Sequence, residues 1–396
     1  MNNPIEAVLV GAGSRGYDAY GSYALHNPDK IKFVAVAELI PERRERFAQA
    51  HQIPPERCFT SWEEMMEGEQ LAPALVNCTM DRIHVDSTLA ALSTGYHVLL
   101  EKPMATNAHD CVRLVQAAEK NERMLQICHV LRYAPFFSTL YDIVQSGRIG
   151  EVITVEHKEN VAFWHMAHSF VRGNWGNTAN SSPMILAKCC HDLDIFVWVL
   201  GRRCMRISSF GTLTHFRSDN IGANIPERCT EGCPIESDCQ YSAPRQYLGE
   251  NTGWPVSVIS VDNSYEARLE ALKTGPYGRC IYRCDNDVVD HQVINMEFEG
   301  DLTVAFTMHG HSHDNCRTMR YSGTKATLRA HEGKRELVVH DYLTGHEEVV
   351  PPVHREGGHG GGDAGLIGAF VEALRNPNSE VLTSCRNSLE SHLILI

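Results

Sequence analysis

A glycine-rich segment that directly follows an apolar run constrains the fold of this 396-residue chain more than any other feature. Residues 6–10 (Glu-Ala-Val-Leu-Val) have the pattern of a buried strand, and Gly11-Ala-Gly-Ser-Arg-Gly16 comes next, before a stretch of helical length. In a strand–turn–helix unit, Gly11 permits the tight turn, Gly13 lets the backbone approach a pyrophosphate, and Gly16 lets helix and strand pack closely. The segment therefore predicts a dinucleotide-binding turn, with the helix N-terminus facing the phosphates.

A second apolar run, residues 32–37, ends at Glu38. An acidic side chain at the end of the second strand accepts hydrogen bonds from the adenosine ribose hydroxyls and repels a 2′-phosphate. Glu38 therefore favours NAD over NADP. Arg15 and Arg43 argue the other way, because either guanidinium could bind a 2′-phosphate.

Strand and helix patterns alternate through the first 130 residues. Further buried strands are expected at 74–78, 97–100 and 124–128, and helical patterns separate them at 41–49, 84–93 and 107–121. This rhythm is typical of right-handed βαβ units, which form a parallel sheet covered on both faces. We predict an α/β Rossmann domain over residues 1–130.

The rhythm changes near residue 150, and we predict an α+β substrate-binding domain over residues 131–396. It would contain a large, open, mostly antiparallel sheet with helices on one face. Alternating runs mark its strands, at 152–158, 281–283, 293–298, 303–308, 327–330 and 336–339. The apolar end at 393–396 directly follows a helical stretch, so we expect further residues beyond Ile396.

Charge and hydropathy exclude several classes of partner. The chain has 36 basic and 49 acidic residues, a net charge of −13, and no dense basic stripe, so nucleic acid is not expected. No apolar run approaches the roughly 20 residues that span a bilayer, and Met1-Asn-Asn-Pro does not begin a signal peptide. We therefore expect a cytoplasmic protein without a membrane partner.

Most of the fourteen cysteines lie in apolar segments, where a reduced thiol behaves as a small hydrophobe. The exception is a polar stretch with Cys229, Cys233 and Cys239, to which Cys280 can be added. Four thiolates can hold a structural zinc. Their spacing matches no common zinc motif, so free thiols or a redox pair are the alternatives.

A lysine follows the strand at 97–100, in Glu101-Lys102-Pro103, where ligands of open α/β sheets bind. This signature, with Thr79 and His84 upstream and His129-Val-Leu-Arg-Tyr-Ala-Pro135 downstream, resembles the Gfo/Idh/MocA (glucose-fructose oxidoreductase/inositol dehydrogenase) family over nearly the whole chain. The resemblance implies NAD-dependent oxidation of a secondary hydroxyl of a sugar, glycoside or cyclitol. It also implies that Lys102 contacts both the substrate hydroxyl and the nicotinamide ribose and assists proton transfer.

The family's second signature departs from the usual pattern. Ala187-Lys-Cys-Cys-His-Asp-Leu-Asp194 keeps His191 and Asp194, but Ala187 stands where the family usually has an aspartate. The segment resembles a branch with Lys-x-x-His-Asp-x-Asp, which implies that Lys188 and His191 face the substrate together on one helix turn. Lys102, His191 and Lys188 are therefore the predicted catalytic residues.

The remaining predicted contacts follow from the motifs and from the resemblance. Trp175 would stack on a sugar face or on the nicotinamide, and the glycine-rich loop before Asp363 would let the backbone approach a ligand. The cofactor-binding set is Gly11, Gly13, Ser14, Arg15, Gly16, Glu38, Thr79, His84, Glu101, Lys102 and Trp175. The substrate-binding set is Arg132, Tyr133, Arg172, Asn174, Asp194, His291 and His359.

Two other functions stay open at this stage. Some relatives use tightly held NAD to oxidise a glycoside transiently at C3, eliminate the aglycone, add water and reduce again, and Lys188 and the many histidines suit such a redox-neutral glycosidase. A non-catalytic sugar sensor is the third possibility, although Lys102 and His191 are both present. In each case we expect a homo-oligomer, a dimer or tetramer formed through the C-terminal sheet.

Overall fold

The computed structural model describes residues 3–376 and 378–396, and the chain forms two compact units. The first contains 1–146, 190–203 and 352–396, and the second contains 147–189 and 204–351. Contacts therefore divide the chain differently from the predicted ranges 1–130 and 131–396. Three segments that we placed in the second domain, 131–146, 190–203 and 352–396, pack with the first unit because they bury apolar helix faces there.

The first unit is built on a six-stranded parallel sheet, as predicted. Its strands have the order β3-β2-β1-β4-β5-β6, which places the glycine turn after β1 at the centre of the sheet. The bounds are β1 Ile5–Val10, β2 Ile31–Ala37, β3 Cys58–Phe59, β4 Ala74–Asn77, β5 His97–Leu100 and β6 Leu125–Ile127. All pairings are parallel. The order β3-β2-β1-β4-β5-β6 is that of a Rossmann sheet.

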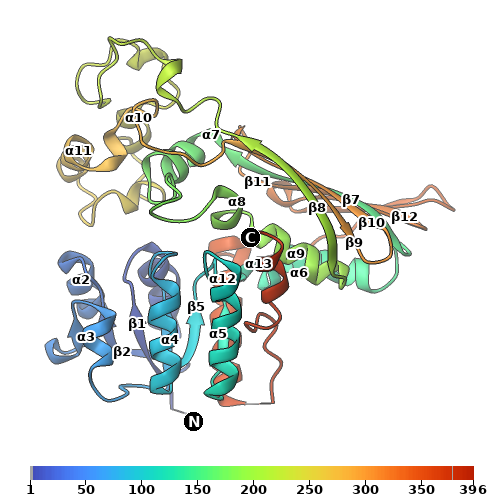
Figure 1. Cartoon of the computed structure of the whole chain (residues 1–396), viewed down its shortest axis with the longest axis horizontal. Helices are drawn as coiled ribbons and strands as arrows, with labels where there is room; N and C mark the ends of the chain where they lie inside the picture. The colour runs from blue at the N-terminus through green and yellow to red at the C-terminus, as the bar shows by residue number, and fades with distance from the viewer. Residues whose placement is uncertain (1–2, 377) are drawn as a thin grey trace. The chain divides into compact units, whose positions relative to one another are not determined.

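Helices cover both faces of this sheet because its strands are buried on both sides. Val8 and Val10 pack with α4 and α5, whereas Phe33 and Phe47 pack edge to face between β2 and α2. The helices are η1 Arg15–Gly21, α1 Ser22–His26, α2 Pro41–His51, α3 Trp62–Met66, α4 His84–Thr94 and α5 Ala108–Lys120. Figure 1 shows α4 and α5 side by side.

The later segments of the first unit complete it beyond β6. Ile127 donates its backbone N–H to the Thr383 carbonyl, so the chain after residue 376 returns to the edge strand. The apolar face of α12, with Leu366, Ile367 and Phe370, is buried. These elements are η3 Val130–Tyr133, α6 Pro135–Gln145, α9 Cys190–Leu200, η10 Gly358–Gly361, α12 Gly362–Arg375 and α13 Leu389–Leu393.

The second unit contains the predicted open sheet, with eight strands in the order β14-β13-β12-β11-β7-β10-β9-β8. All neighbours are antiparallel except β7 and β10. The bounds are β7 Val152–Ala162, β8 Cys204–Thr212, β9 His291–Phe298, β10 Leu302–Ser312, β11 Cys316–Gly323, β12 Ala326–His331, β13 Glu336–Asp341 and β14 Glu347–Val349. Its helices include α7 Phe163–His165, η4 Met166–Arg172, α8 Met184–Ala187, α10 Ala243–Tyr247 and α11 Tyr265–Thr274.

One predicted strand is wrong, and four strands of the structure were not predicted: the short β3 and β14, and the longer β8 and β11. Residues 281–283 form a turn, in which Arg283 donates its backbone N–H to the Cys280 carbonyl, because Ile281 and Tyr282 pack against a pocket rather than in a sheet. Strand β8 was missed because nearly all its residues are exposed, so its sequence lacks the alternation of apolar and polar residues that marks a half-buried strand. Strand β11 was also not predicted.

No helix in residues 3–376 and 378–396 combines the length and apolar character needed to cross a membrane.

Candidate functional site

The turn after β1 has the geometry that a pyrophosphate needs. Gly11 has φ +88°, and a Cβ there would lie 2.6 Å from the Cys78 carbonyl oxygen. A Cβ on Gly16 would lie 2.1 Å from the Gly11 carbonyl oxygen. Beside Gly13, in contrast, the nearest atom is a guanidinium nitrogen of Arg43 at 3.8 Å. The backbone is therefore tight where it turns and open where a phosphate would approach, so these residues fit a dinucleotide.

Glu38 holds its carboxylate beside this turn. One oxygen accepts a 2.6 Å hydrogen bond from the Ala12 N–H, and the other accepts a 2.9 Å bond from the Ile40 N–H. The residue is 8% exposed. The carboxylate is thus fixed at the carboxyl end of β2, in the place where an acid binds ribose hydroxyls.

Arg15 is turned into the protein rather than towards a 2′-phosphate. Its Nε donates to Glu101 Oε1 at 2.6 Å, and its two terminal nitrogens donate to the Asp363 carboxylate at 2.9 and 3.0 Å. It also donates to the Tyr20 hydroxyl at 3.0 Å. Arg15 is therefore no longer an argument for NADP, whereas Arg43, which lies beside Gly13, still is. No sequence signal singled out Tyr20.

Lys102 follows β5 and is anchored by its neighbours. Its backbone N–H donates to Glu101 Oε2 at 3.1 Å. His84 is buried, with ring nitrogens 2.7 Å from the Pro103 carbonyl oxygen and 3.0 Å from the Thr79 carbonyl oxygen. His84 therefore joins the segments after β4 and β5, and its contact with the cofactor stays a prediction.

His191 lies on α9 in the same unit, between two other histidines. Its ring centroid is 5.8 Å from that of His129 and 5.9 Å from that of His359. Lys102 affects the pKa values of two neighbours of His191. Burial raises the pKa of Cys190 to about 12, and the charge of Lys102 opposes that rise. Lys102 also helps burial to lower the pKa of His129 to about 3. Both predicted catalytic residues, Lys102 and His191, therefore belong to the first unit.

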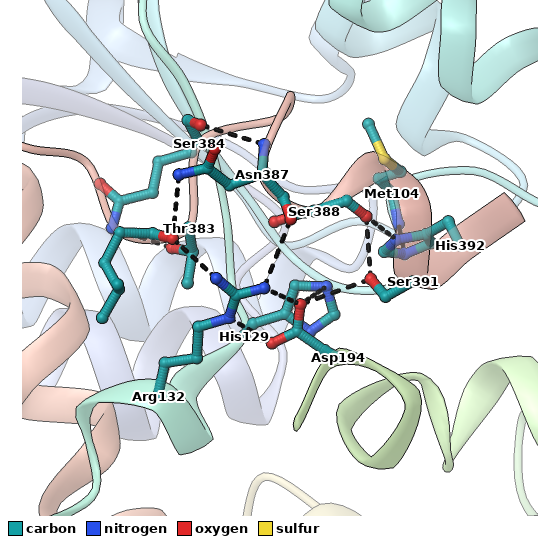
Figure 2. A network of polar contacts seen from close by, with 12 residues as sticks. Met104, His129, Arg132, Asp194, Thr383, Ser384, Asn387, Ser388, Ser391 and His392 are labelled. Atoms are coloured by element: carbon teal, nitrogen blue, oxygen red, sulfur yellow. Dashed lines mark hydrogen bonds and ion pairs between the residues drawn. The ribbon is translucent and has the colours of Figure 1, made fainter. Parts of the chain in front are cut away.

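A buried polar network surrounds Asp194, which lies on the same helix as His191 (Figure 2). Arg132 binds Asp194 through two hydrogen bonds of 2.6 and 2.7 Å and also donates to the carbonyls of Leu382 and Asn387. The Tyr133 hydroxyl accepts from Gln126 at 2.9 Å. We predicted substrate contacts for Arg132, Tyr133 and Asp194, but their polar groups bind within the protein, so we assign them a positioning role.

The prediction that Lys188 and His191 share one helix turn is wrong. Helix α8 ends at Ala187 and α9 begins at Cys190, so Lys188 lies between two helices and belongs to the second unit. Its ammonium is 3.3 Å from the carboxylate of buried Glu159, which Arg317 also binds. The Lys188 ammonium therefore pairs with a buried carboxylate, and this contact differs from the catalytic role that we predicted for it.

The second unit holds three other predicted substrate residues, Arg172, Asn174 and His291, and the predicted cofactor residue Trp175. Arg172 is buried and donates to the carbonyls of Arg279 and Tyr241, both at 2.7 Å, so its predicted substrate bonds are replaced by loop contacts. Asn174 is exposed and Trp175 is half-buried near Phe170. The ring of His291, at the start of β9, is oriented by Asp290 at 2.7 Å.

The four candidate zinc ligands line one pocket, but they do not form a metal centre. Its free volume of about 10 Å³ is hardly enough for one water molecule. Within residues 3–376 and 378–396, no three His, Cys, Asp or Glu side chains are arranged to hold a metal. Burial raises the pKa of Cys239 and Cys280, and Arg172 contacts Cys229 Sγ at 3.6 Å. The zinc prediction is therefore not supported, and all the cysteines are free thiols.

Comparison with family models gives matches in both halves of the chain. The model of an oxidoreductase family with an NAD-binding Rossmann fold, GFO_IDH_MocA, matches residues 5–129. The model of the GFO/IDH/MocA C-terminal domain matches residues 137–329.

Individual proteins show the same likeness. YteT of Bacillus subtilis (strain 168), named as an oxidoreductase, is 25% identical over 332 residues, which are 79% of this chain and 75% of that protein. An inositol 2-dehydrogenase of Salmonella paratyphi B is 25% identical over 197 residues, and the chain covers 54% of its length. The fold is similar to that of the WlbA dehydrogenase from Bordetella pertussis in complex with NADH and UDP-GlcNAcA, with a TM-score of 0.68, 16% identity, and coverage of 99% and 94% of the two chains.

Proposed function

Because the chain belongs to the GFO/IDH/MocA family of NAD-binding oxidoreductases, we propose that it oxidises a secondary hydroxyl of a sugar, glycoside or cyclitol. Bound NAD supplies the acceptor for the hydride. His191 accepts the hydroxyl proton, and Lys102 assists this transfer. The placement of Lys102 at the carboxyl end of β5, with His191 in the same unit, is the observation on which this proposal rests.

The chain's own residues supply three functions in this reaction. Gly11 and Gly13 would hold the pyrophosphate of the dinucleotide, and Glu38 would hold its adenosine ribose. The Lys102 ammonium holds the substrate oxygen and stabilises negative charge on it as the proton leaves. His191 accepts the proton, as general bases commonly do. The polyhydroxylated substrate class agrees with the names of the inositol 2-dehydrogenase and of the UDP-GlcNAcA complex.

A substrate panel tests this proposal. Polyols, free sugars and glycosides are incubated with the protein and NAD, and NADH formation and aglycone release are scored separately. Steady NADH formation with at least one compound supports the oxidoreductase. Aglycone release without NADH would replace it with the redox-neutral glycosidase.

The redox-neutral glycosidase stays a second candidate because His359 lies beside His191, and that reaction needs several proton transfers. The argument that we drew from Lys188 is weaker, since its ammonium pairs with Glu159.

The choice of cofactor gives a separate prediction. Replacing Glu38 with alanine removes a carboxylate that would bind ribose hydroxyls, and charge-assisted hydrogen bonds contribute about 1.5–3 kcal/mol. We expect the Kd for NADH to rise by roughly ten- to hundredfold, while the Kd for NADPH changes little or falls. Nucleotide fluorescence measures both values without substrate. The exposed Glu42→Ala on α2 is the control, and equal NADH affinity in E38A and E42A would contradict the assignment.

We further propose that the chain pairs with a second copy through its open sheet. Strand β8 is an edge strand, and Phe210 lies opposite Val293 in the β8–β9 pair, with Phe210 73% exposed. Exposed apolar side chains beside an unpaired edge favour association. Phe210→Glu is expected to reduce the molar mass in analytical ultracentrifugation to that of a monomer. Leu343→Glu, in an exposed turn, should leave it unchanged; a monomeric wild type would refute the pairing.

A further inference from the structure

His359 is held in a backbone conformation that other residues avoid. It has φ 52° and ψ 39°, within a run of four neighbouring glycines at 357, 358, 360 and 361. A non-glycine residue in the left-handed region costs free energy, and such strain persists where the surroundings fix the residue for a function. The glycines on both sides let the chain bend around this one side chain.

The ring of His359 is oriented by a carboxylate that is itself fixed. Its Nδ1 lies 3.0 Å from Asp363 Oδ1, and both oxygens of Asp363 accept from Arg15. Burial raises the pKa of Asp363, but Arg15 and His359 lower it by more than burial raises it. The pKa of Asp363 therefore lies well below the ordinary value for a carboxyl group. Asp363 therefore stays ionised, and its carboxylate orients the His359 ring.

The two neighbours of His191 differ in their access to water. The His359 side chain is 39% exposed, whereas His129 is completely buried. Neither ring nitrogen of His129 has a hydrogen-bond partner among the described residues. Its Nε2 lies 3.7 Å from Asp194, whose carboxylate already binds Arg132. A proton on His129 would be poorly solvated, so of these two neighbours of His191 only His359 has ready access to water.

We propose that His359 exchanges protons between His191 and solvent, rather than binding the substrate as the sequence suggested. The role in turnover rests on the proposed function. There, the substrate O–H bond breaks and its proton passes to His191, while the hydride leaves the same carbon for the acceptor. His191 then passes a proton to His359, directly or through one water, and His359 releases a proton to bulk water. One proton is released for each hydride transferred.

The charged groups near His359 come from several elements. Asp363 on α12 and Arg15 on η1 face it through the ion pair, and His191 lies on α9. Arg355 packs beside Gly361 in the same loop. On η3, Arg132 is bound to Asp194. Within this set, Asp363 is the carboxylate that contacts the His359 ring.

Proton exchange of the His191 ring tests the proposal without any substrate. With ¹⁵N-labelled histidine, the exchange rate of the His191 ring N–H with water is measured by NMR in wild type and in His359→Asn. Asparagine tolerates the left-handed conformation and can still hydrogen-bond to Asp363, but it cannot carry a proton. We expect at least a tenfold slower exchange in H359N. His26→Asn, at an exposed helix end, is the matched control. Equal exchange rates in wild type and H359N would overturn the proposal.

Turnover gives a second readout once a substrate is known. His359→Gly keeps the backbone conformation without strain and opens the position to solvent. We expect kcat to fall at least tenfold with little change in KM, and added imidazole to restore much of the loss. A raised KM with unchanged kcat would instead return His359 to the substrate-binding set and overturn its role in proton exchange. An inactive wild type would refute the proposed function while leaving the exchange result valid.

Discussion

Replacing Lys102 with methionine is expected to lower kcat by about 10²–10⁴-fold, the range over which a positioned proton-transfer group accelerates a reaction. Methionine keeps the length of the side chain but carries no charge and no proton. The segment that holds Lys102 is fixed by Glu101 and by the His84 bridge, neither of which needs the ammonium. The substitution should therefore remove chemistry while leaving the site in place.

The measurement is kcat on the best compound of the panel, with the Kd for NADH determined in parallel. An unchanged Kd together with the lost turnover assigns Lys102 to the chemical step, since an interaction made only in the transition state lowers kcat. Lys120→Met, at the end of α5, is the matched control and should retain full activity. Retention of more than half of the activity by K102M would exclude the lysine from proton transfer.

Replacing Arg132 with methionine is expected to destabilise the protein by about 3–5 kcal/mol, because it leaves the buried carboxylate of Asp194 without its cation. For a unit of this size, that corresponds to a fall in melting temperature of roughly 10 °C. Arg132 also binds two carbonyls of the returning C-terminal segment, as Figure 2 shows, so its loss loosens more than one contact. Thermal unfolding followed by circular dichroism measures the effect.

Two comparisons identify the ion pair as the cause. Arg386→Gln breaks an exposed pair with Glu119 in the same unit and should leave the melting temperature nearly unchanged. The double variant R132M/D194L removes the buried carboxylate together with its cation. Its loss of stability should therefore be smaller than the sum of the losses in the two single variants. Additive losses would mean that the two side chains act independently.

The same pair predicts a dependence of stability on pH. Burial raises the pKa of Asp194, but Arg132 and His129 lower it by more, so the folded-state pKa lies below the ordinary value. A carboxyl with a lowered folded-state pKa stabilises the fold above its unfolded pKa of roughly 3.9, and the stabilisation is lost as the pH falls through the folded pKa. The difference in melting temperature between wild type and R132M should therefore shrink below about pH 4.

Much of the fold could be predicted from the sequence because its signals are local. The first strand, the glycine turn at Gly11 and the acid Glu38 lie within one stretch of chain. Steric demands explain the glycine, and electrostatic demands explain the acid. The strands of the open sheet were recognised where one face is buried, as in β9 and β10. Strand β8 was not, because an edge strand exposed on both faces carries no alternation.

The candidate site was only partly predictable because side-chain partners lie far apart in the sequence. Arg15 could have faced a 2′-phosphate, and only the fold places Glu101 and Asp363 around it. Lys188 was matched to His191 by spacing, but its position between two helices and the distant Glu159 decide its contact.

The sequence by itself determined that this chain carries a glycine turn typical of dinucleotide sites, an acid at the end of the second strand pattern and a lysine after the fourth, because each depends on neighbours a few residues away. The tertiary structure alone decided which polar groups are already bound within the protein. Arg132, Asp194 and Arg172 bind internally, whereas His359 faces both His191 and solvent. A buried charge must find its partner within the fold, and the fold is what brings distant residues together.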